Sequence, residues 1–315
     1  MTTPPSVLIS TWSGGLFAVR SGATAHEIPS GVVAGLTADG SGGALAIVGG
    51  GSLCRRSATG RWITLASSPA ELVCCAALGD AVFAGTNDAR VLRLDADGAL
   101  TPLAGFDHVA GRETWYAGAA LIDGRWVGPP LGARSMCATS DHSTLLVNIH
   151  VGGIPRSIDS GESWTPTIDI DCDVHQVCAH PRRPELVAAA TGVGLALSRD
   201  AGATWTTEHH GLHARHCTAV AFVGEDVFVS AATDHFAKEG AIYRRAIAGS
   251  ATLQPVDGSL PRWLDGICDT GNIAARDGCV AVADRGGHVY LSHDRGGSWE
   301  RVAEGLPPPS GVLIC

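Results

Sequence analysis

The sequence has no apolar run approaching about 18 residues, so no segment is long enough to cross a membrane as a helix. It has no run of basic residues either, and its formal net charge is −9, which argues against a nucleic-acid partner. The first residues show neither the charged segment nor the long apolar segment of a signal peptide. Together these absences predict a cytoplasmic protein that acts away from membranes and nucleic acids.

Motifs of several enzyme classes are missing as well. The chain contains no G-x-x-x-x-G-K phosphate-binding loop and no nucleophile-elbow motif, so we expect neither a nucleotide cofactor nor a serine-hydrolase triad. Its ten cysteines form no C-x-x-C pair, although Cys74 and Cys75 are adjacent. Scattered cysteines without a secretory signal predict free, buried thiols and not a disulfide framework.

What the sequence does contain is a repeat. The pattern S-x-D-x-G-x-x-W occurs at Ser157–Trp164, Ser198–Trp205 and Ser292–Trp299. The first and second of these tryptophans lie 41 residues apart, and the second and third lie 94 apart, about two periods of 47. Such a period is typical of a radially repeated β architecture. Within each copy we expect Asp to bond the backbone two residues on, Gly to take a positive φ, and Trp to fill the space between units.

Strand patterns align around these motifs as units of four strands, with each motif joining the third strand to the fourth. The clearest unit comprises Val174–His180, Leu186–Thr191, Gly194–Ser198 and Thr204–Glu208. The N-terminal stretch offers only three strands, and Gly311–Cys315 can supply the missing one. Pairing of the two ends would close a ring and remove exposed sheet edges.

The sequence therefore predicts an all-β fold, a seven-bladed β-propeller of four-stranded antiparallel blades formed by residues 1–315 as one domain. Six or eight blades remain open because residues 106–134 show no clear blade pattern. This long connection is either a degenerate blade or surface flap, or a loop insertion that forms a lid over the axial pocket.

The three motifs resemble the Asp boxes of the BNR-repeat β-propellers, a family that includes sialidases, sortilin-type receptors, xyloglucan-active glycosidases and photosystem II assembly factors. Asn148–Ser157 and Asp173–Val177 are also similar to a bacterial group of cytosolic BNR-repeat proteins. The resemblance implies the propeller fold but no single activity, because one fold carries unrelated functions. A sialidase is disfavoured, since the chain has only three tyrosines and Gly153–Arg156 carries the Arg-Ile-Pro letters in another order.

In such a ring, the ends of the second strands and the starts of the first strands meet on one side, which we call the axial face. When the expected strands of each blade are aligned on the repeated motif, four histidines are placed on the axial face: His150, His175, His216 and His235. Converging neutral imidazoles suit a divalent transition metal such as Fe, Cu, Zn or Mn, with an aspartate, Asp173 or Asp234, orienting a ring. The alternative is that these histidines form hydrogen bonds or contact a substrate without a metal.

Other polar and aromatic residues share the axial face. We expect catalytic roles for Asp234, Arg134 and Arg285, with the two arginines holding an anionic group of the substrate. The expected substrate-binding residues are Trp12, Asn148, Trp115, Tyr116, Gln176 and Asn272.

These residues favour an enzyme that acts on a small polar molecule in the axial pocket. A histidine-bound metal would act as a Lewis acid or activate water, in lyase, hydrolase or oxygenase chemistry. The alternative is a non-catalytic propeller for protein interaction or assembly. A third hypothesis is a glycoside hydrolase, for which the candidate carboxylates are Asp234, Asp269 and Asp284.

Overall fold

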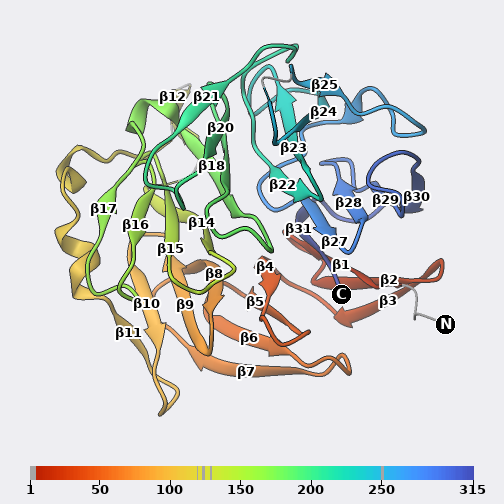
Figure 1. The fold of residues 1–315 in the computed structure, drawn as a ribbon. Coiled ribbons are helices and arrows are strands. Elements are labelled where there is room, and N and C mark those ends of the chain that lie inside the picture. Colours follow the sequence, from red (N-terminus) through yellow and green to blue (C-terminus); the bar gives the residue numbers. More distant parts are fainter. Residues whose placement is uncertain (1–4, 119, 123–124, 128–129, 250–251) are drawn as a thin grey trace.

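The computed structural model describes residues 5–118, 120–122, 125–127, 130–249 and 252–315. Seven blades of four antiparallel strands stand around a central axis (Figure 1). In each blade one inner strand lies next to the axis and contacts the inner strands of its neighbours. The predicted fold, blade number and blade type are thereby confirmed.

Blades 1 to 3 use the N-terminal part of the chain and its last strand. Their strand orders are β31-β1-β2-β3, β4-β5-β6-β7 and β8-β9-β10-β11, reading outward from the axis. The strands are β1 (Val7–Thr11), β2 (Leu16–Arg20), β3 (Ala23–Ile28), β4 (Val33–Ala38), β5 (Ala44–Val48), β6 (Ser52–Arg56), β7 (Trp62–Ser67), β8 (Leu72–Leu78), β9 (Ala81–Thr86), β10 (Val91–Leu94), β11 (Leu100–Pro102) and β31 (Pro309–Ile314).

Blades 4 to 7 follow in chain order, each with its first strand innermost. The short β26 (Leu264–Asp265) pairs with β24 of blade 6 and adds a strand that the sequence pattern did not predict. The other strands are β14 (Gly132–Ala138), β15 (Leu145–His150), β16 (Pro155–Ser157), β17 (Thr165–Pro166), β18 (Val174–Ala179), β19 (Val187–Thr191), β20 (Gly194–Ser198), β21 (Thr206–Glu208), β22 (Val220–Val223), β23 (Asp226–Ala232), β24 (Glu239–Ala246), β25 (Gln254–Pro255), β27 (Ile273–Arg276), β28 (Cys279–Ala283), β29 (Val289–Ser292) and β30 (Glu300–Ala303).

The two ends of the chain close the ring. β31 pairs antiparallel with β1, so that Val7 lies opposite Ile314 and Ile9 lies opposite Val312. The last strand is thus the inner strand of the blade that the first three strands complete. This closure by the terminal strands is the one that the sequence predicted.

The three S-x-D-x-G-x-x-W motifs form similar turns between the third and fourth strands of blades 4, 5 and 7. In the first, Ser157 Oγ donates to Asp159 Oδ1 at 2.7 Å and accepts from Gly161 N at 2.8 Å. Gly161 has a φ of 92°, a region that favours glycine. Asp159 Oδ1 accepts from the backbone N of Ser163, four residues on, at 2.9 Å. The aspartate therefore closes a wider turn than the one expected, in which its side chain would bond the backbone two residues on.

The carboxylates of these turns give a prediction for stability in acid. Hydrogen bonds from Ser298 and Ser292 lower the pKa of Asp294 to about 2. Because the folded pKa lies below the unfolded value of about 3.9, the stabilising contribution is complete above about pH 4 and is lost as the pH falls toward 2. Asp294→Asn should therefore lower the Tm at about pH 7, and the difference from the parent should shrink at about pH 3. A difference in Tm that is the same at both pH values would contradict this account.

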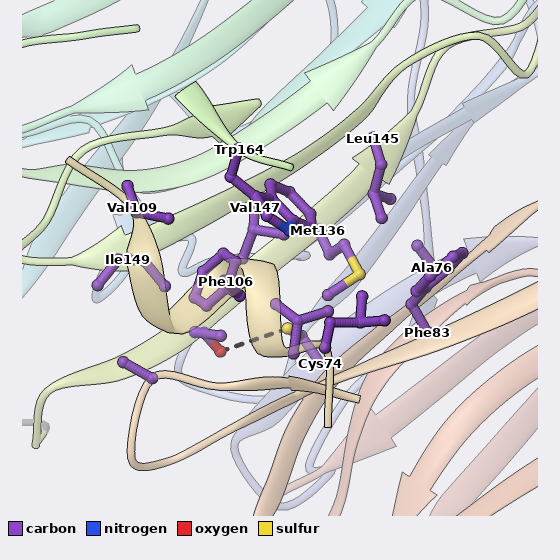
Figure 2. Packing of buried hydrophobic residues seen from close by; sticks show 14 of the residues in the cluster. Cys74, Ala76, Phe83, Phe106, Val109, Met136, Leu145, Val147, Ile149 and Trp164 are labelled. Carbon is purple, nitrogen blue, oxygen red and sulfur yellow. Dashed lines mark hydrogen bonds between the residues drawn. The ribbon is translucent and has the colours of Figure 1, made fainter. Parts of the chain in front are cut away.

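A hydrophobic cluster fills the space between blades 3 and 4 (Figure 2). Trp164, the tryptophan of the first motif, is buried there and meets the Phe106 ring edge-on, with the ring centroids 4.9 Å apart. Figure 2 shows Phe106 and Val109 facing Val147 of blade 4. The motif tryptophan thus packs between neighbouring units, as predicted, and it also anchors the segment that follows β11.

In its described residues, that segment does not form a four-stranded blade. It contains two short 3-10 helices, η1 (Ala104–His108) and η2 (Arg112–Thr114), and the two-stranded pair β12 (Ala120–Ile122) and β13 (Arg125–Val127). A third 3-10 helix, η3 (Ile170–Cys172), precedes β18. Within the described ranges, no helix is both long and apolar enough to span a membrane.

Candidate active site on the axial face

The inner strands all begin on the same side of the ring. Thr270, before β27, donates from Oγ1 to the carbonyl oxygen of His175 in β18 at 3.2 Å. Ser310 in β31 donates from Oγ to the carbonyl oxygen of Val33, where β4 begins. A central cavity of about 890 Å³ runs along these strands, and its lining includes Trp12, Arg134, His150, His235, Asp269 and Arg285.

Two of the predicted site residues occupy β-bulges. In the register of β14 against β15, Arg134 is an extra residue between Ala133 and Ser135. In the register of β18 against β19, His175 is the extra residue in the same way. A bulge bends the strand locally and redirects a side chain, and both bulges lie at the axial end of an inner strand. These bulges explain how Arg134 reaches the cavity and how His175 reaches the neighbouring aspartate.

His150, Asp173 and His175 form a compact group. His150 Nε2 lies 3.0 Å from Asp173 Oδ1, and His175 Nε2 lies 3.4 Å from Asp173 Oδ2. One ligand atom from each side chain lies within 4.8 Å of the other two. In the described part of the chain, this is the one group of three His, Cys, Asp or Glu side chains that meets this condition.

The backbone leaves space for the Asp173 carboxylate. Asp173 follows η3 in the left-handed region, with a φ of 51°, and its carbonyl oxygen accepts from Gly192 N at 2.8 Å. A Cβ on Gly192 would lie 3.0 Å from Asp173 Oδ2. Glycine at position 192 therefore allows the carboxylate to turn toward the two imidazoles.

The hydrogen bond of His175 fixes the position of its proton. His175 Nδ1 lies 2.7 Å from the carbonyl oxygen of Cys217, and a carbonyl oxygen can only accept, so Nδ1 carries the hydrogen. A neutral His175 then presents the lone pair of Nε2 to Asp173 Oδ2. A cation, either a proton or a metal ion, is needed to hold two such electron-rich atoms together.

The contact between His150 and Asp173 is close without being a hydrogen bond. Asp173 Oδ1 and His150 Nδ1 are both buried and have no hydrogen-bond partner among the described residues. The 3.0 Å approach of His150 Nε2 to Asp173 Oδ1 therefore lacks hydrogen-bond geometry. Three donor atoms that lie this close to one another can surround a common ion.

The pKa values favour the forms that bind metal. Burial, opposed by Asp173 and reinforced by Arg134, lowers the pKa of His150. Burial alone would raise the pKa of Asp173, but its contacts with His150 and His175 outweigh burial and hold the pKa far below its usual range. At neutral pH, His150 is therefore a neutral imidazole and Asp173 a carboxylate, as metal binding requires.

The other two predicted metal histidines are not members of this donor group. His216 packs beside His175 with ring centroids 4.6 Å apart, and burial lowers its pKa to about 4. Its Nε2 is buried and has no hydrogen-bond partner in the ranges described. His235 lines the cavity on the side of Asp269. The structure thus brings together two of the four histidines, and it adds Asp173 as a third donor where the sequence suggested only an orienting role.

A second polar group surrounds Asp269. Arg134 Nη2 donates to Asp269 Oδ1 at 3.0 Å, and Arg134 Nε donates to Thr270 Oγ1 at 3.0 Å. Arg285 Nη2 lies 4.0 Å from Asp269 Oδ2, and Arg285 Nη1 donates to the carbonyl oxygen of His235 at 2.8 Å. Burial would raise the pKa of Asp269, but the charge of Arg134 and the smaller effects of the Thr270 backbone and its other neighbours together outweigh burial, so the pKa is lowered. Two guanidinium groups share one carboxylate, which leaves positive charge for an anionic ligand.

The segment that follows β11 reaches the histidine group. Tyr116 and Val151 exchange two backbone hydrogen bonds, of 3.1 and 2.8 Å. Gly118 lies so close to the His150 ring that a Cβ would be 2.0 Å from its Cε1. Tyr116 and Gly118 therefore lie against one side of the candidate site, and Phe106 anchors the segment that carries them in the core.

Three of the predicted substrate-binding residues line the cavity: Trp12, Gln176 and Asn272. Trp12 is 52% exposed, so its ring is available to a ligand. The Gln176 amide bonds the backbone of blade 6 and of the loop before blade 7. Asn272 is buried and donates to the carbonyl oxygen of Pro309 at 3.3 Å. These two amides join neighbouring blades.

Six of the predicted residues do not line the cavity in the described structure: His175, His216 and four others. Asn148 is fully buried and donates to the carbonyl oxygen of Val174 at 2.6 Å. Trp115 is buried in the cluster between blades 3 and 4. Tyr116 is exposed, and Asp234 is exposed and accepts from a neighbouring backbone N. Register placed these residues near the axial face, but it could not show which way each side chain turns.

The carboxylates considered for a glycosidase do not gather in the cavity. Asp284 is fully buried and accepts from the backbone N of Asp265 and of His288. Of the three candidates only Asp269 is part of the cavity lining in the described structure. This placement disfavours the paired carboxylates of a glycoside hydrolase. The role of Asp269 beside the arginines was missed, although Asp269, like Asp173, comes shortly before an inner strand.

Topology and site define the chain as a seven-bladed β-propeller with charged residues and histidines at one end of its central cavity. No protein-family model matches the chain, and no curated protein matches it in sequence.

Solved structures match the chain in fold. A proposed 6-phosphogluconolactonase from Bacteroides uniformis has a TM-score of 0.65 at 16% identity, with 100% of both chains covered. A catalytically inactive virginiamycin B lyase from Staphylococcus aureus with quinupristin has a TM-score of 0.61 at 10% identity, covering 90% of this chain and 91% of the lyase. The GH74 enzyme of Niastella koreensis has a TM-score of 0.62 at 14% identity over 85% of this chain, which spans 45% of that enzyme's length. At these identities the similarity shows the fold alone.

Proposed function

We propose that the axial face carries a metal-dependent active site that acts on a small anionic molecule. The observation that carries this proposal is the meeting of His150 Nε2, His175 Nε2 and the Asp173 carboxylate within 4.8 Å. His150 comes from the end of β15, whereas Asp173 and His175 come from the residue before β18 and from the start of that strand. Each reaches the group through a specific feature: a strand end, a left-handed residue and a bulge.

The donor set fits a transition metal. Two imidazoles and one carboxylate suit Zn²⁺ or Fe²⁺ and leave further positions for a ligand. Such an ion polarises an oxygen of the substrate or lowers the pKa of water, which favours hydrolysis or elimination. The bond from His175 Nδ1 to the carbonyl oxygen of Cys217 is the outer contact usual for a metal-binding histidine, because it fixes the ring and the tautomer.

The two arginines supply the second half of the site. Arg134 and Arg285 line the same cavity as His150. An anionic group that binds Arg134 and Arg285 would place the adjoining atoms of the substrate beside His150 and Asp173. Asp269 holds Arg134 in position and offsets part of its charge.

Two further observations support the proposal. The structural neighbours include a glycoside hydrolase, a proposed lactonase and a lyase, so the propeller fold is used by enzymes of these classes. The ten cysteines are all free, which suits a reducing compartment such as the cytoplasm.

Elemental analysis of the purified protein tests the metal centre. We expect about one equivalent of Zn or Fe per chain, and we expect it to be lost in His150→Ala and in His175→Ala, because two donors hold a divalent ion much more weakly than three. The matched control is His210→Ala, which removes an exposed histidine and should leave the metal content unchanged.

Two outcomes would count against the proposal. Protein that contains no metal, even after dialysis against Zn²⁺ or Fe²⁺, would contradict the proposed metal centre. If His150→Ala and His175→Ala also left thermal stability unchanged, the non-catalytic interaction propeller would become the better account.

A further inference from the structure

The central cavity has two chemically different ends. It is lined along the whole of β14, from Gly132 to Ala138, so it extends through the depth of the ring. Charged and histidine side chains gather where the inner strands begin. Among the described residues, the second halves of β4, β8, β14 and β18 contribute no charged side chain to the lining.

Small apolar side chains line the other end. Ala77, Ala138 and Ala179 stand at or near the ends of their strands and are half-buried, as residues facing an open channel should be. Cys137 and Cys178 precede two of these alanines. Burial raises the pKa of both thiols, so they remain uncharged at neutral pH. Within the described residues, the lower channel therefore has no charged side chain, and its small side chains leave space beside the edges of the inner strands.

The length of this apolar part follows from strand geometry. Arg134 and Ala138 are four residues apart on β14, which at about 3.3 Å per residue corresponds to roughly 13 Å. An extended alkyl chain with C–C bonds of about 1.5 Å covers that depth with about ten carbons. A compact polar substrate would leave this surface unused.

We propose that the substrate is a carboxylate with an unbranched apolar chain, whose head group binds Arg134 and Arg285 while the chain extends along β14 toward Ala138. This inference rests on the proposed function, because it takes the arginine end as the place where the anionic group binds. The charge supports one orientation: the guanidinium groups attract the carboxylate, and the apolar end excludes it.

Binding of straight-chain carboxylates to the metal-loaded protein tests the inference by isothermal titration calorimetry. Each added CH₂ that enters the apolar channel should raise affinity about fourfold, so octanoate should bind about 200-fold more tightly than butanoate. Alkylamines of the same lengths should not bind, because the arginines repel their head group. A carboxylate series whose affinity does not change with chain length would overturn the inference.

A channel-filling variant locates the binding site. Ala138→Leu should weaken decanoate binding by at least about tenfold, and it should leave butanoate within about twofold of the parent. Ala179→Leu on the neighbouring strand repeats the test if Ala138→Leu does not fold. Ala203→Leu, at an exposed position in the second S-x-D-x-G-x-x-W motif, is the matched control and should change neither affinity. Equal decanoate affinity in the folded variants and the parent would contradict binding along β14.

Repeating the titration on chelator-treated protein separates this inference from the proposed function. If the gain per CH₂ persists in protein that binds no metal under any condition, the channel inference stands and the metal centre falls. If the protein holds its metal but shows no dependence on chain length, the metal centre stands and the channel inference falls.

Discussion

Asp173→Asn is expected to weaken binding of Zn²⁺ or Fe²⁺ by at least about 100-fold. The substitution keeps the size of the side chain but removes the charge that both His150 and His175 face at 3.0 and 3.4 Å. Competition with a chromogenic chelator measures the affinity. The loss is expected to be large because Asp173 is the only anionic donor of the group.

Asp171→Asn is the matched control. Asp171 lies two residues away, is exposed, and is not part of the donor group, so its replacement should leave metal affinity within about twofold of the parent. If Asp173→Asn bound metal as tightly as the parent, the carboxylate would not be a ligand. The contact between the imidazoles and Asp173 would then be a shared proton.

Phe106→Ala is expected to lower the free energy of unfolding by about 3–5 kcal/mol. Phe106 is fully buried and packs edge-on against Trp164, with the centroids 4.9 Å apart, between two blades that share this core. Its removal leaves a cavity that the rigid strands on either side cannot close. Denaturant unfolding at equilibrium measures the change.

Phe236→Ala provides the comparison, because Phe236 is 63% exposed and its loss should change stability by less than about 0.5 kcal/mol. A change of less than about 1 kcal/mol in Phe106→Ala would mean that the segment after β11 is not anchored in the core. Gly118 would then not be held against His150 by this packing.

The propeller could be predicted because its strongest signals are local. The S-x-D-x-G-x-x-W motifs combine a turn, a positive-φ glycine and a packing tryptophan in eight residues, so each marks the junction of two strands. With these junctions located, the remaining strand lengths and the unpaired strand expected at Gly311–Cys315 predicted a closed ring, and β31 does pair with β1. β26 was missed because two residues carry no periodic pattern.

The candidate site was only partly predictable. Register identified His150, His175 and Arg134 as axial, and the structure places the two histidines within reach of Asp173. The bulges that redirect His175 and Arg134 leave no pattern in the sequence, because one extra residue preserves the apolar character of a short strand. The pairing of Arg134 with Asp269 was also hidden, since the two residues lie 135 positions apart and meet only when the ring closes.

The account depends most directly on one ion between three side chains. Crystals grown with Zn²⁺ and measured at the zinc absorption edge should show an anomalous peak about 2.0–2.2 Å from His150 Nε2, His175 Nε2 and an oxygen of Asp173. No peak between these side chains, or a peak elsewhere with the three still uncoordinated, would contradict the proposed centre.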